Sequence, residues 1–226
     1  MGTIINALAI IIGGALGLLF RKGFPEKIAQ STLQVLGLFT LVVGLGMAIQ
    51  GQELIMVLIS LALGAGLGEW LDIEGRLDRF GGWLEKRLHL TEKSPAKGFI
   101  YASLLFCVGS MAIVGSITDG LKGDSSILVT KALLDGVISI PFAANMGAGV
   151  LGSAVPILIY QGGLTLLASK IQFFFTPVMV RELTSVGGVI VIGIGINVLG
   201  LQKVRVGNFI PALILIGLIL YVKALF

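Results

Sequence analysis

Long apolar runs alternate with short polar segments along the chain, and this pattern sets the expected fold. A membrane-spanning helix needs about 20 mostly apolar residues. The pattern predicts seven crossings, at residues 3–20, 33–49, 54–71, 98–117, 149–168, 186–201 and 209–225. An eighth segment, 126–144, contains two charged residues and a proline, so either a full crossing or a re-entrant segment fits it. The sequence therefore predicts an all-α integral membrane protein with seven or eight transmembrane helices.

One segment, residues 73–97, has a different pattern from the apolar runs. Apolar residues recur there at helical spacing, with charged residues on the other face. We expect an amphipathic helix that lies in the membrane interface, with a partner-binding helix as the alternative. The segment divides the chain into four parts: residues 1–72, the interfacial segment 73–97, a central polar and glycine-broken part 98–148, and residues 149–226.

The first and last parts resemble each other. Residues 13–51 align with residues 162–200 at a constant offset of 149 without gaps, and five glycines and one valine coincide. This alignment predicts a two-fold internal repeat of three helices. If segment 126–144 crosses the membrane, the two copies have opposite orientations. An inverted repeat is typical of many transporters, whose sites lie near the bilayer midplane between the copies.

Composition confirms the membrane class and excludes others. The chain has 226 residues, of which 56% are hydrophobic and 12% charged, whereas soluble domains have about 25% charged residues. Nucleic-acid binding is not expected, because the basic residues that give the net charge of +4 cluster beside the predicted spans. The single Cys107 excludes an internal disulfide bond, and the single His89 cannot form a histidine metal site. The first 20 residues lack the basic start and cleavage site of a signal peptide.

Loop charges predict the orientation of the early spans. Nine basic residues lie after the first and third spans, so we place these segments in the cytoplasm. If segment 126–144 crosses, Lys203 and Arg205 also lie in the cytoplasm, and Lys170 and Arg181 lie outside. If the segment is re-entrant, these two assignments are exchanged, so loop charges do not decide between seven and eight crossings.

The main candidate site is the pair Lys131 and Asp135, which share a helix face because they are four residues apart. An unpaired charge at the centre of a bilayer is costly, and intramembrane charges often mark ion paths. Three interpretations stay open: a self-neutralising structural pair, a carboxylate that lines an ion or proton path, and a lysine that extends to the interface.

Other polar residues near the centre of the chain are weaker candidates. Small hydroxyl residues beside glycines, with a nearby carboxylate, offer oxygen ligands for Na⁺, although ordinary helix packing explains them too. They are Ser110, Ser116, Thr118 and Asp119. Asn145 follows Pro141 and precedes two glycines, which predicts either a functional helix break or a plain turn. Gln161, Asn6 and Asn197 are typical of hydrogen bonds between helices.

Motifs of enzymes and of known channel filters are missing from the sequence. There is no nucleotide-binding P-loop, HExxH motif, Cys/His cluster or potassium-channel filter. We therefore expect no catalytic activity, no bound metal and no cofactor.

Three stretches indicate a family. They are MGTIINALAIIIGGALGLLFRKGFP at the start, CVGSMAIVGSITDGLKGD in the centre and LLDGVISIPFAANMGAGVLGSA after it. Over nearly its whole length the chain resembles a bacterial membrane family called domain of unknown function 554. The resemblance implies a bacterial or archaeal cytoplasmic membrane protein. The family has been labelled as a sodium channel or pump, and it has no established functional residues to carry over.

Together, these observations predict a small membrane transporter or channel for an ion, such as Na⁺ or H⁺, or for a small solute. The alternative is a membrane scaffold or regulator whose amphipathic helix recruits a partner. The expected partners are the lipid bilayer, a monovalent cation or small solute, and a second copy of the chain, because glycine faces recur.

Overall fold

The computed structural model describes residues 1–21, 26–79 and 95–223, and its described elements are helices. In chain order they are α1 (Gly2–Arg21), α2 (Glu26–Ala48), α3 (Leu54–Trp70), α5 (Pro95–Cys107), α6 (Ser110–Lys122), α7 (Ser126–Met146), α8 (Gly149–Gly152), α9 (Ala154–Ile171), η1 (Gln172–Phe174), α10 (Pro177–Val198), η2 (Val206–Phe209) and α11 (Ile210–Lys223). A further helical stretch, Ile73–Arg79, follows α3 at a bend of 51°.

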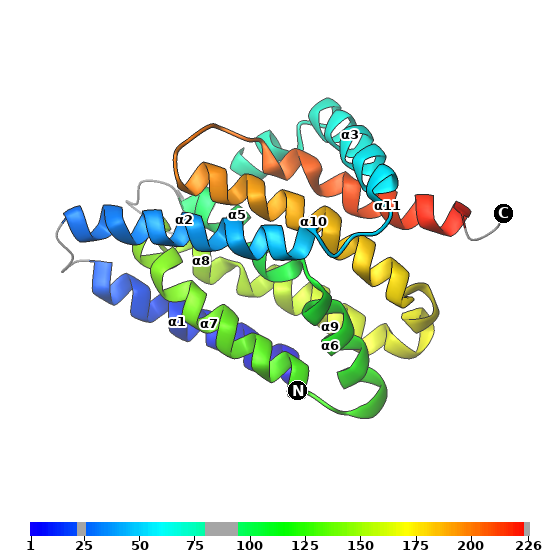
Figure 1. Ribbon diagram of the computed structural model, residues 1–226. Coiled ribbons are helices and arrows are strands. Elements are labelled where there is room, and N and C mark those ends of the chain that lie inside the picture. Colours follow the sequence, from blue (N-terminus) through cyan, green and yellow to red (C-terminus); the bar gives the residue numbers. More distant parts are fainter. Residues whose placement is uncertain (22–25, 80–94, 224–226) are drawn as a thin grey trace.

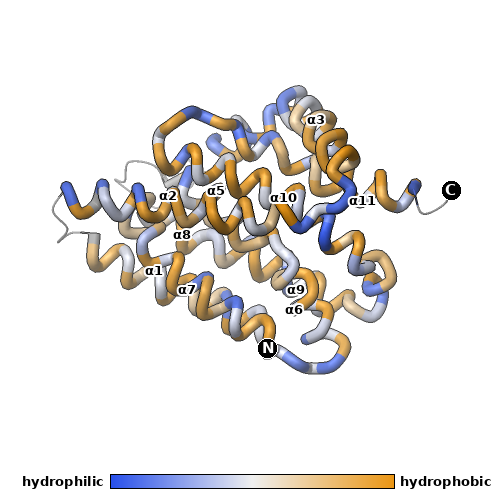
Figure 2. The backbone as a smooth tube through the Cα atoms, viewed as in Figure 1, coloured by the Kyte–Doolittle hydropathy of each residue, from blue (hydrophilic) through white to orange (hydrophobic). Residues whose placement is uncertain are grey.

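The helices are long and apolar enough for a membrane protein. Six of the described helices could cross a bilayer, and the number rises to eight if each of two bent helix pairs is one crossing. Hydrophobic residues run along the helices, and hydrophilic residues gather mainly near helix ends (Figure 2). On α2, Val35, Leu38, Val42 and Leu45 are each more than half exposed, as expected for side chains in contact with lipid. The prediction of an all-helical membrane protein is confirmed.

Segment 126–144 is part of the continuous helix α7, which packs along α1 (Figure 1). The two helices run in the same direction, because Gly2 lies against Leu128 and Gly17 against the backbone of Ile140. A Cβ atom on Gly13 would lie 2.1 Å from the carbonyl oxygen of Gly136, so the backbones nearly touch there. The helix is long and apolar enough to span, which fits the full crossing better than the re-entrant alternative.

The helices follow the internal repeat closely. Shifted by 149 residues, α1 covers 151–170 and α2 covers 175–197, compared with 154–171 for α9 and 177–198 for α10. Shifted α3 covers 203–219, and α11 covers 210–223. Each helix packs against its counterpart, which gives the pairs α1 with α9, α2 with α10 and α3 with α11.

All three pairs are antiparallel (Figure 1). Lys223, at the end of α11, forms an ion pair of 2.6 Å with Glu53, just before α3. At the crossing of α2 and α10, a Cβ atom on Gly188 would lie 2.6 Å from the carbonyl oxygen of Gly44. Small residues at these crossings let the backbones approach closely, which is how helices associate in lipid. The repeated halves therefore run in opposite directions, as in an inverted repeat.

Several helix boundaries differ from the sequence-based expectation, and two of the differences have a clear local cause. The predicted span 98–117 is not one straight helix: α5 and α6 meet at an angle of 61°, and Gly109 between them has φ of 137°. Side chains rarely tolerate this backbone conformation, so glycine is required there. The predicted span 186–201 begins nine residues earlier, at Pro177, because Thr176 caps α10 by accepting a hydrogen bond of 3.2 Å from the Met179 N–H.

The expected interfacial helix is only partly visible. Residues 73–79 are helical, and residues 80–94 lie outside the described residues.

Candidate functional site

A cluster of four buried polar side chains lies where α1, α7 and α9 pack together. We call Asn6, Lys131, Asp135 and Gln161 the polar cluster. Lys131 and Asp135 are 5% and 6% exposed, and Asn6 and Gln161 have no exposed surface. Burial of this many polar groups among apolar helices is costly unless the groups bind one another or a ligand.

The charged pair predicted from sequence forms on one face of α7. The Lys131 ammonium binds Oδ2 of Asp135, and the Lys131 Nζ also lies 5.9 Å from the centre of the Phe106 ring. One helical turn separates the two residues, so the geometry follows directly from their spacing. Both side chains are buried and bind each other, which favours the first two interpretations over a lysine that extends to the interface.

Asn6 joins the pair to the repeat interface. Its Nδ2 donates to Asp135 Oδ2 at 3.0 Å and to Gln161 Oε1 at 3.3 Å. Lys131 and Asn6 therefore bind the same carboxylate oxygen. Asn6 lies on the first helix of one repeat and Gln161 on the first helix of the other, so the cluster lies at the junction of the two copies.

The cluster has hydrogen-bonding capacity that its own side chains do not use. Asn6 Oδ1 and Gln161 Nε2 are buried and have no hydrogen-bond partner among the residues that the structure describes. The hydroxyls of Ser116 on α6 and Thr165 on α9 are also buried without a hydrogen-bond partner among the described residues, and α6 packs against α9. Buried polar atoms without partners are rare in proteins, and each requires an explanation such as a bound ion, water or substrate.

The other residues predicted on α6 do not gather around one point. Ser110 begins α6 and Asp119 lies nine residues later, which is about 13 Å along a helix. Asp119 instead accepts hydrogen bonds of 3.2 Å from the Gly2 N–H and 2.6 Å from the Ser125 hydroxyl, and it pairs with the N-terminal amine. It stabilises the start of α1, and Thr118 lies beside it in the sequence, near the end of the helix.

Asn145 also lies apart from the polar cluster. Its Nδ2 donates to the Pro141 carbonyl oxygen at 2.8 Å, within α7. The helix continues past Pro141 and ends at Met146, and Gly147 then turns the chain with φ of 86° into α8. Asn197 similarly bonds the backbone of Val204 and closes the turn after α10.

Two residues are more important in the structure than the sequence suggested. Asn6 was only a weak candidate, although a lone amide in an apolar span was the available signal. Glu182, which lies between the predicted spans 149–168 and 186–201, has no exposed surface. Its carboxylate accepts the backbone N–H groups of Gln52 and Glu53 at 3.0 and 3.3 Å, and it pairs with Arg181 at 2.9 Å. Glu182 thereby fixes the loop between α2 and α3.

The family described as "Protein of unknown function (DUF554)" matches residues 1–221. The chain is 30% identical over 225 residues to the uncharacterised membrane protein YdfK of Bacillus subtilis, which covers 98% of this chain and 96% of YdfK. It is also 30% identical over 220 residues to the uncharacterised protein YqgA of Escherichia coli, covering 95% and 94% of the two chains. No solved structure matched the chain.

Proposed function

We propose a function for this chain, which belongs to the DUF554 family of membrane proteins, on the basis of its polar cluster. The protein is a transporter or channel of the cytoplasmic membrane for a monovalent cation, Na⁺ or H⁺. The cation passes through the polar cluster, and no chemical reaction on a substrate is involved. The observation that carries the proposal is the buried amide oxygen Asn6 Oδ1, which has no hydrogen-bond partner among the described residues and belongs to a side chain bound to the buried Asp135 carboxylate.

The ligand chemistry of the cluster suits a hard cation. Asp135 offers a carboxylate and Asn6 offers its free amide oxygen Oδ1, which are the oxygen ligands that hard cations prefer. Gln161 Oε1 already accepts the Asn6 amide and orients it. Asp135 Oδ2 accepts hydrogen bonds from both Lys131 and Asn6, so Oδ1 is the carboxylate oxygen left for a cation. In this scheme the Lys131 ammonium occupies the cation's place while the site is empty. Arrival of the cation displaces Lys131 and keeps Asp135 neutralised throughout.

The position of the cluster supports the same proposal. Inverted-repeat transporters bind their substrates between the two copies. Here Asn6 and Gln161 contact each other across that junction at 3.3 Å. The broken helix α5–α6 adjoins the cluster, because Phe106 at the end of α5 contacts Lys131. Broken helices at membrane depth are tolerated where they line a cavity or are buried in protein.

The direct test is cation flux into liposomes that contain the purified protein, under Na⁺, K⁺ and H⁺ gradients. We expect the wild type to conduct Na⁺ or H⁺, and Asp135→Asn to lower the flux at least about tenfold while the protein stays folded. Asp124→Asn is the matched control, because this carboxylate is exposed and lies outside the cluster. Absence of flux in every gradient contradicts the proposal and favours the scaffold alternative. So does an unchanged flux in Asp135→Asn.

A second test concerns orientation. With α7 as a crossing, Lys203 and Arg205 lie on the same side as the basic loops after α1 and α3, which the positive-inside rule places in the cytoplasm. In a Cys107→Ala background, a cysteine at position 203 should resist an impermeant maleimide in intact cells. A cysteine at position 170 should react. The reverse labelling pattern contradicts the proposed orientation.

A further inference from the structure

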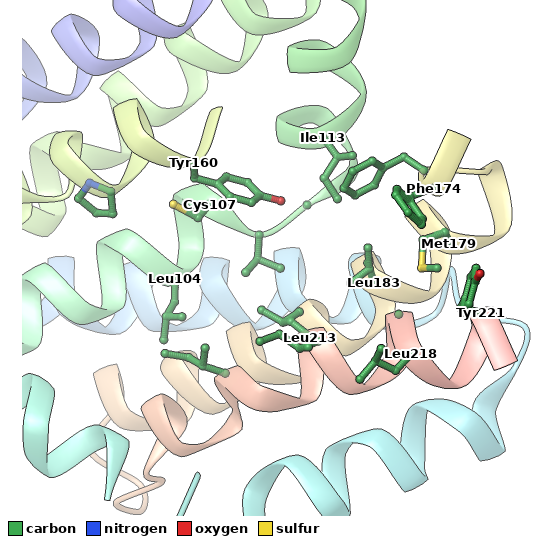
Figure 3. Close-up of a pocket in the computed structure, with 17 residues that line it drawn as sticks. Leu104, Cys107, Ile113, Tyr160, Phe174, Met179, Leu183, Leu213, Leu218 and Tyr221 are labelled. Carbon is green, nitrogen blue, oxygen red and sulfur yellow. The ribbon is translucent and has the colours of Figure 1, made fainter. Parts of the chain in front are cut away.

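A large apolar cavity lies next to the helix break and apart from the polar cluster. Its volume is about 830 Å³, and its walls come from α5, α6, α9, η1, α10 and α11 (Figure 3). Leu104, Ile113, Leu183 and Leu213 are typical of its lining. The volume is within the range of roughly 300–1,000 Å³ that small-molecule sites occupy.

The lining shows what kind of molecule the cavity can hold. Its only polar side-chain groups among the described residues are the hydroxyls of Tyr160 and Tyr221 and the thiol of Cys107. A cation or a polar solute would lose its hydration there without replacement ligands. Cys107 borders the cavity, and its neighbour Phe106 instead contacts Lys131. The end of α5 therefore separates the cavity from the polar cluster, and hydrocarbon is the chemistry that fits.

One end of the cavity combines aromatic and basic residues. Phe174 and Tyr221 lie at this end, and their rings are 6.4 Å apart (Figure 3). The same helix ends carry Lys170, Arg181 and Lys223. Aromatic and basic residues at helix ends are typical of the level of the lipid headgroups.

The basic residues at this end are not equally neutralised. Lys223 pairs with Glu53 at 2.6 Å, and Arg181 pairs with the buried Glu182 at 2.9 Å. Lys170 is exposed and has no ion pair within the described part of the chain. The Lys170 ammonium therefore complements an anionic headgroup, and Lys170 lies four residues before Phe174 of the cavity lining.

We propose that the cavity binds one acyl chain of an anionic phospholipid, whose headgroup lies at Lys170. The chain enters between η1 and the end of α11 and extends toward the break at Gly109. This lipid site is separate from the proposed cation site, and neither depends on the other.

The test uses a phosphatidylglycerol that carries a photoreactive diazirine in one acyl chain, and a phosphatidylcholine with identical chains. Purified protein is reconstituted with each lipid and irradiated, and labelled peptides are located by mass spectrometry. We expect phosphatidylglycerol to label cavity residues such as Leu104 and Leu213 in preference to the lipid-facing side of α2. Phosphatidylcholine should label them less. Lys170→Gln should lower the preference about fivefold, whereas Lys203→Gln, at the opposite end of α10, should leave it unchanged.

A second pair of variants tests the cavity itself. Gly217 lines the cavity, and a Cβ atom there meets nothing closer than Met179 Sδ at 3.8 Å, so Gly217→Phe should fill the space and abolish labelling of Leu104. Gly46→Phe is the matched control, because a Cβ atom at Gly46 has no neighbour within 4 Å and the position lies on α2. Equal labelling by both lipids in the wild type overturns the headgroup assignment, even if Gly217→Phe does not fold. Labelling of Leu104 that persists in a folded Gly217→Phe overturns the cavity assignment.

Discussion

Removing one or both charges of the buried pair separates its structural role from its functional role. Lys131→Met leaves Asp135 buried with only its hydrogen bond from Asn6, and Asp135→Asn leaves the Lys131 ammonium with no counter-ion. Breaking a buried pair by removing one partner costs about 3–5 kcal/mol. An independent estimate, the insertion cost of a charge at the centre of a membrane helix, is about 2.5–3.5 kcal/mol. Each single variant should therefore lose about 3 kcal/mol of unfolding free energy or more.

The double variant Lys131→Met/Asp135→Asn should recover most of this loss. It buries no charge, and the new amide still offers an oxygen to the Asn6 side chain. Replacement of a buried ion pair by neutral groups of similar volume is often neutral or stabilising. With a small loss in the double variant, the coupling energy between the two sites should be about 5 kcal/mol, which is far above the 0.3–0.5 kcal/mol scatter of independent sites.

Unfolding in mixed micelles, with SDS as the denaturant and circular dichroism as the signal, measures these free energies. Lys203→Met serves as the control for a lysine that is exposed, and it should change little. Additive losses in the double variant would refute the view that the pair is held together by mutual neutralisation. Cation flux then tests function: the double variant should be as stable as the wild type and transport nothing. Normal flux in a stable double variant would show that the pair is structural only.

Three further predictions concern helix packing. Gly13→Ala should destabilise the protein by about 1–3 kcal/mol in thermal unfolding in detergent, because its Cβ would lie 2.1 Å from a backbone oxygen of α7. The repeat counterpart Gly162→Ala has open space around its Cβ and should leave the stability unchanged. Gly109→Ala should cost about 1–3 kcal/mol in the same assay, since φ of 137° is strained for any side chain, and an unchanged melting temperature would contradict the assigned break. Glu182→Ala should expose the α2–α3 loop to proteolysis, because two backbone N–H groups lose their acceptor, whereas Glu182→Gln should largely preserve protection.

The membrane class, the approximate spans and the repeat were predictable from sequence because each depends on an averaged property. Composition and apolar run length decide whether a helix enters a bilayer. The spacing of Lys131 and Asp135 placed both on one face of a helix whatever their surroundings. The antiparallel packing of the repeated helices agrees with the expectation that segment 126–144 crosses the membrane, because that crossing gives the two copies opposite orientations.

The details that were missed depend on neighbours that are distant in sequence. Gly109 is one of 33 glycines, and nothing local distinguishes it from those in straight helices. Glu182 lies outside the predicted spans because its charge lowers the local hydropathy. Its carboxylate nevertheless accepts hydrogen bonds from two backbone N–H groups about 130 residues away in the sequence. Asn6 could have faced lipid, a loop or a neighbour. Only the packing of α1 against both α7 and α9 gives it two partners.

The two repeats contribute unequally to the polar cluster, and this asymmetry bears on how a cation would cross. Shifted by 149 residues, Asn6 corresponds to Val155, and Gln161 corresponds to Ile12. These counterparts are apolar and exposed, at 57% for Val155 and 60% for Ile12. The repeats therefore share a helical framework but direct different faces toward their junction, and both charges come from α7, which lies between the copies in the chain. A strictly symmetric protein would carry two equivalent sites. Here the sequence supplies one, so under the proposed function a cation that enters from either side would meet the same Asp135.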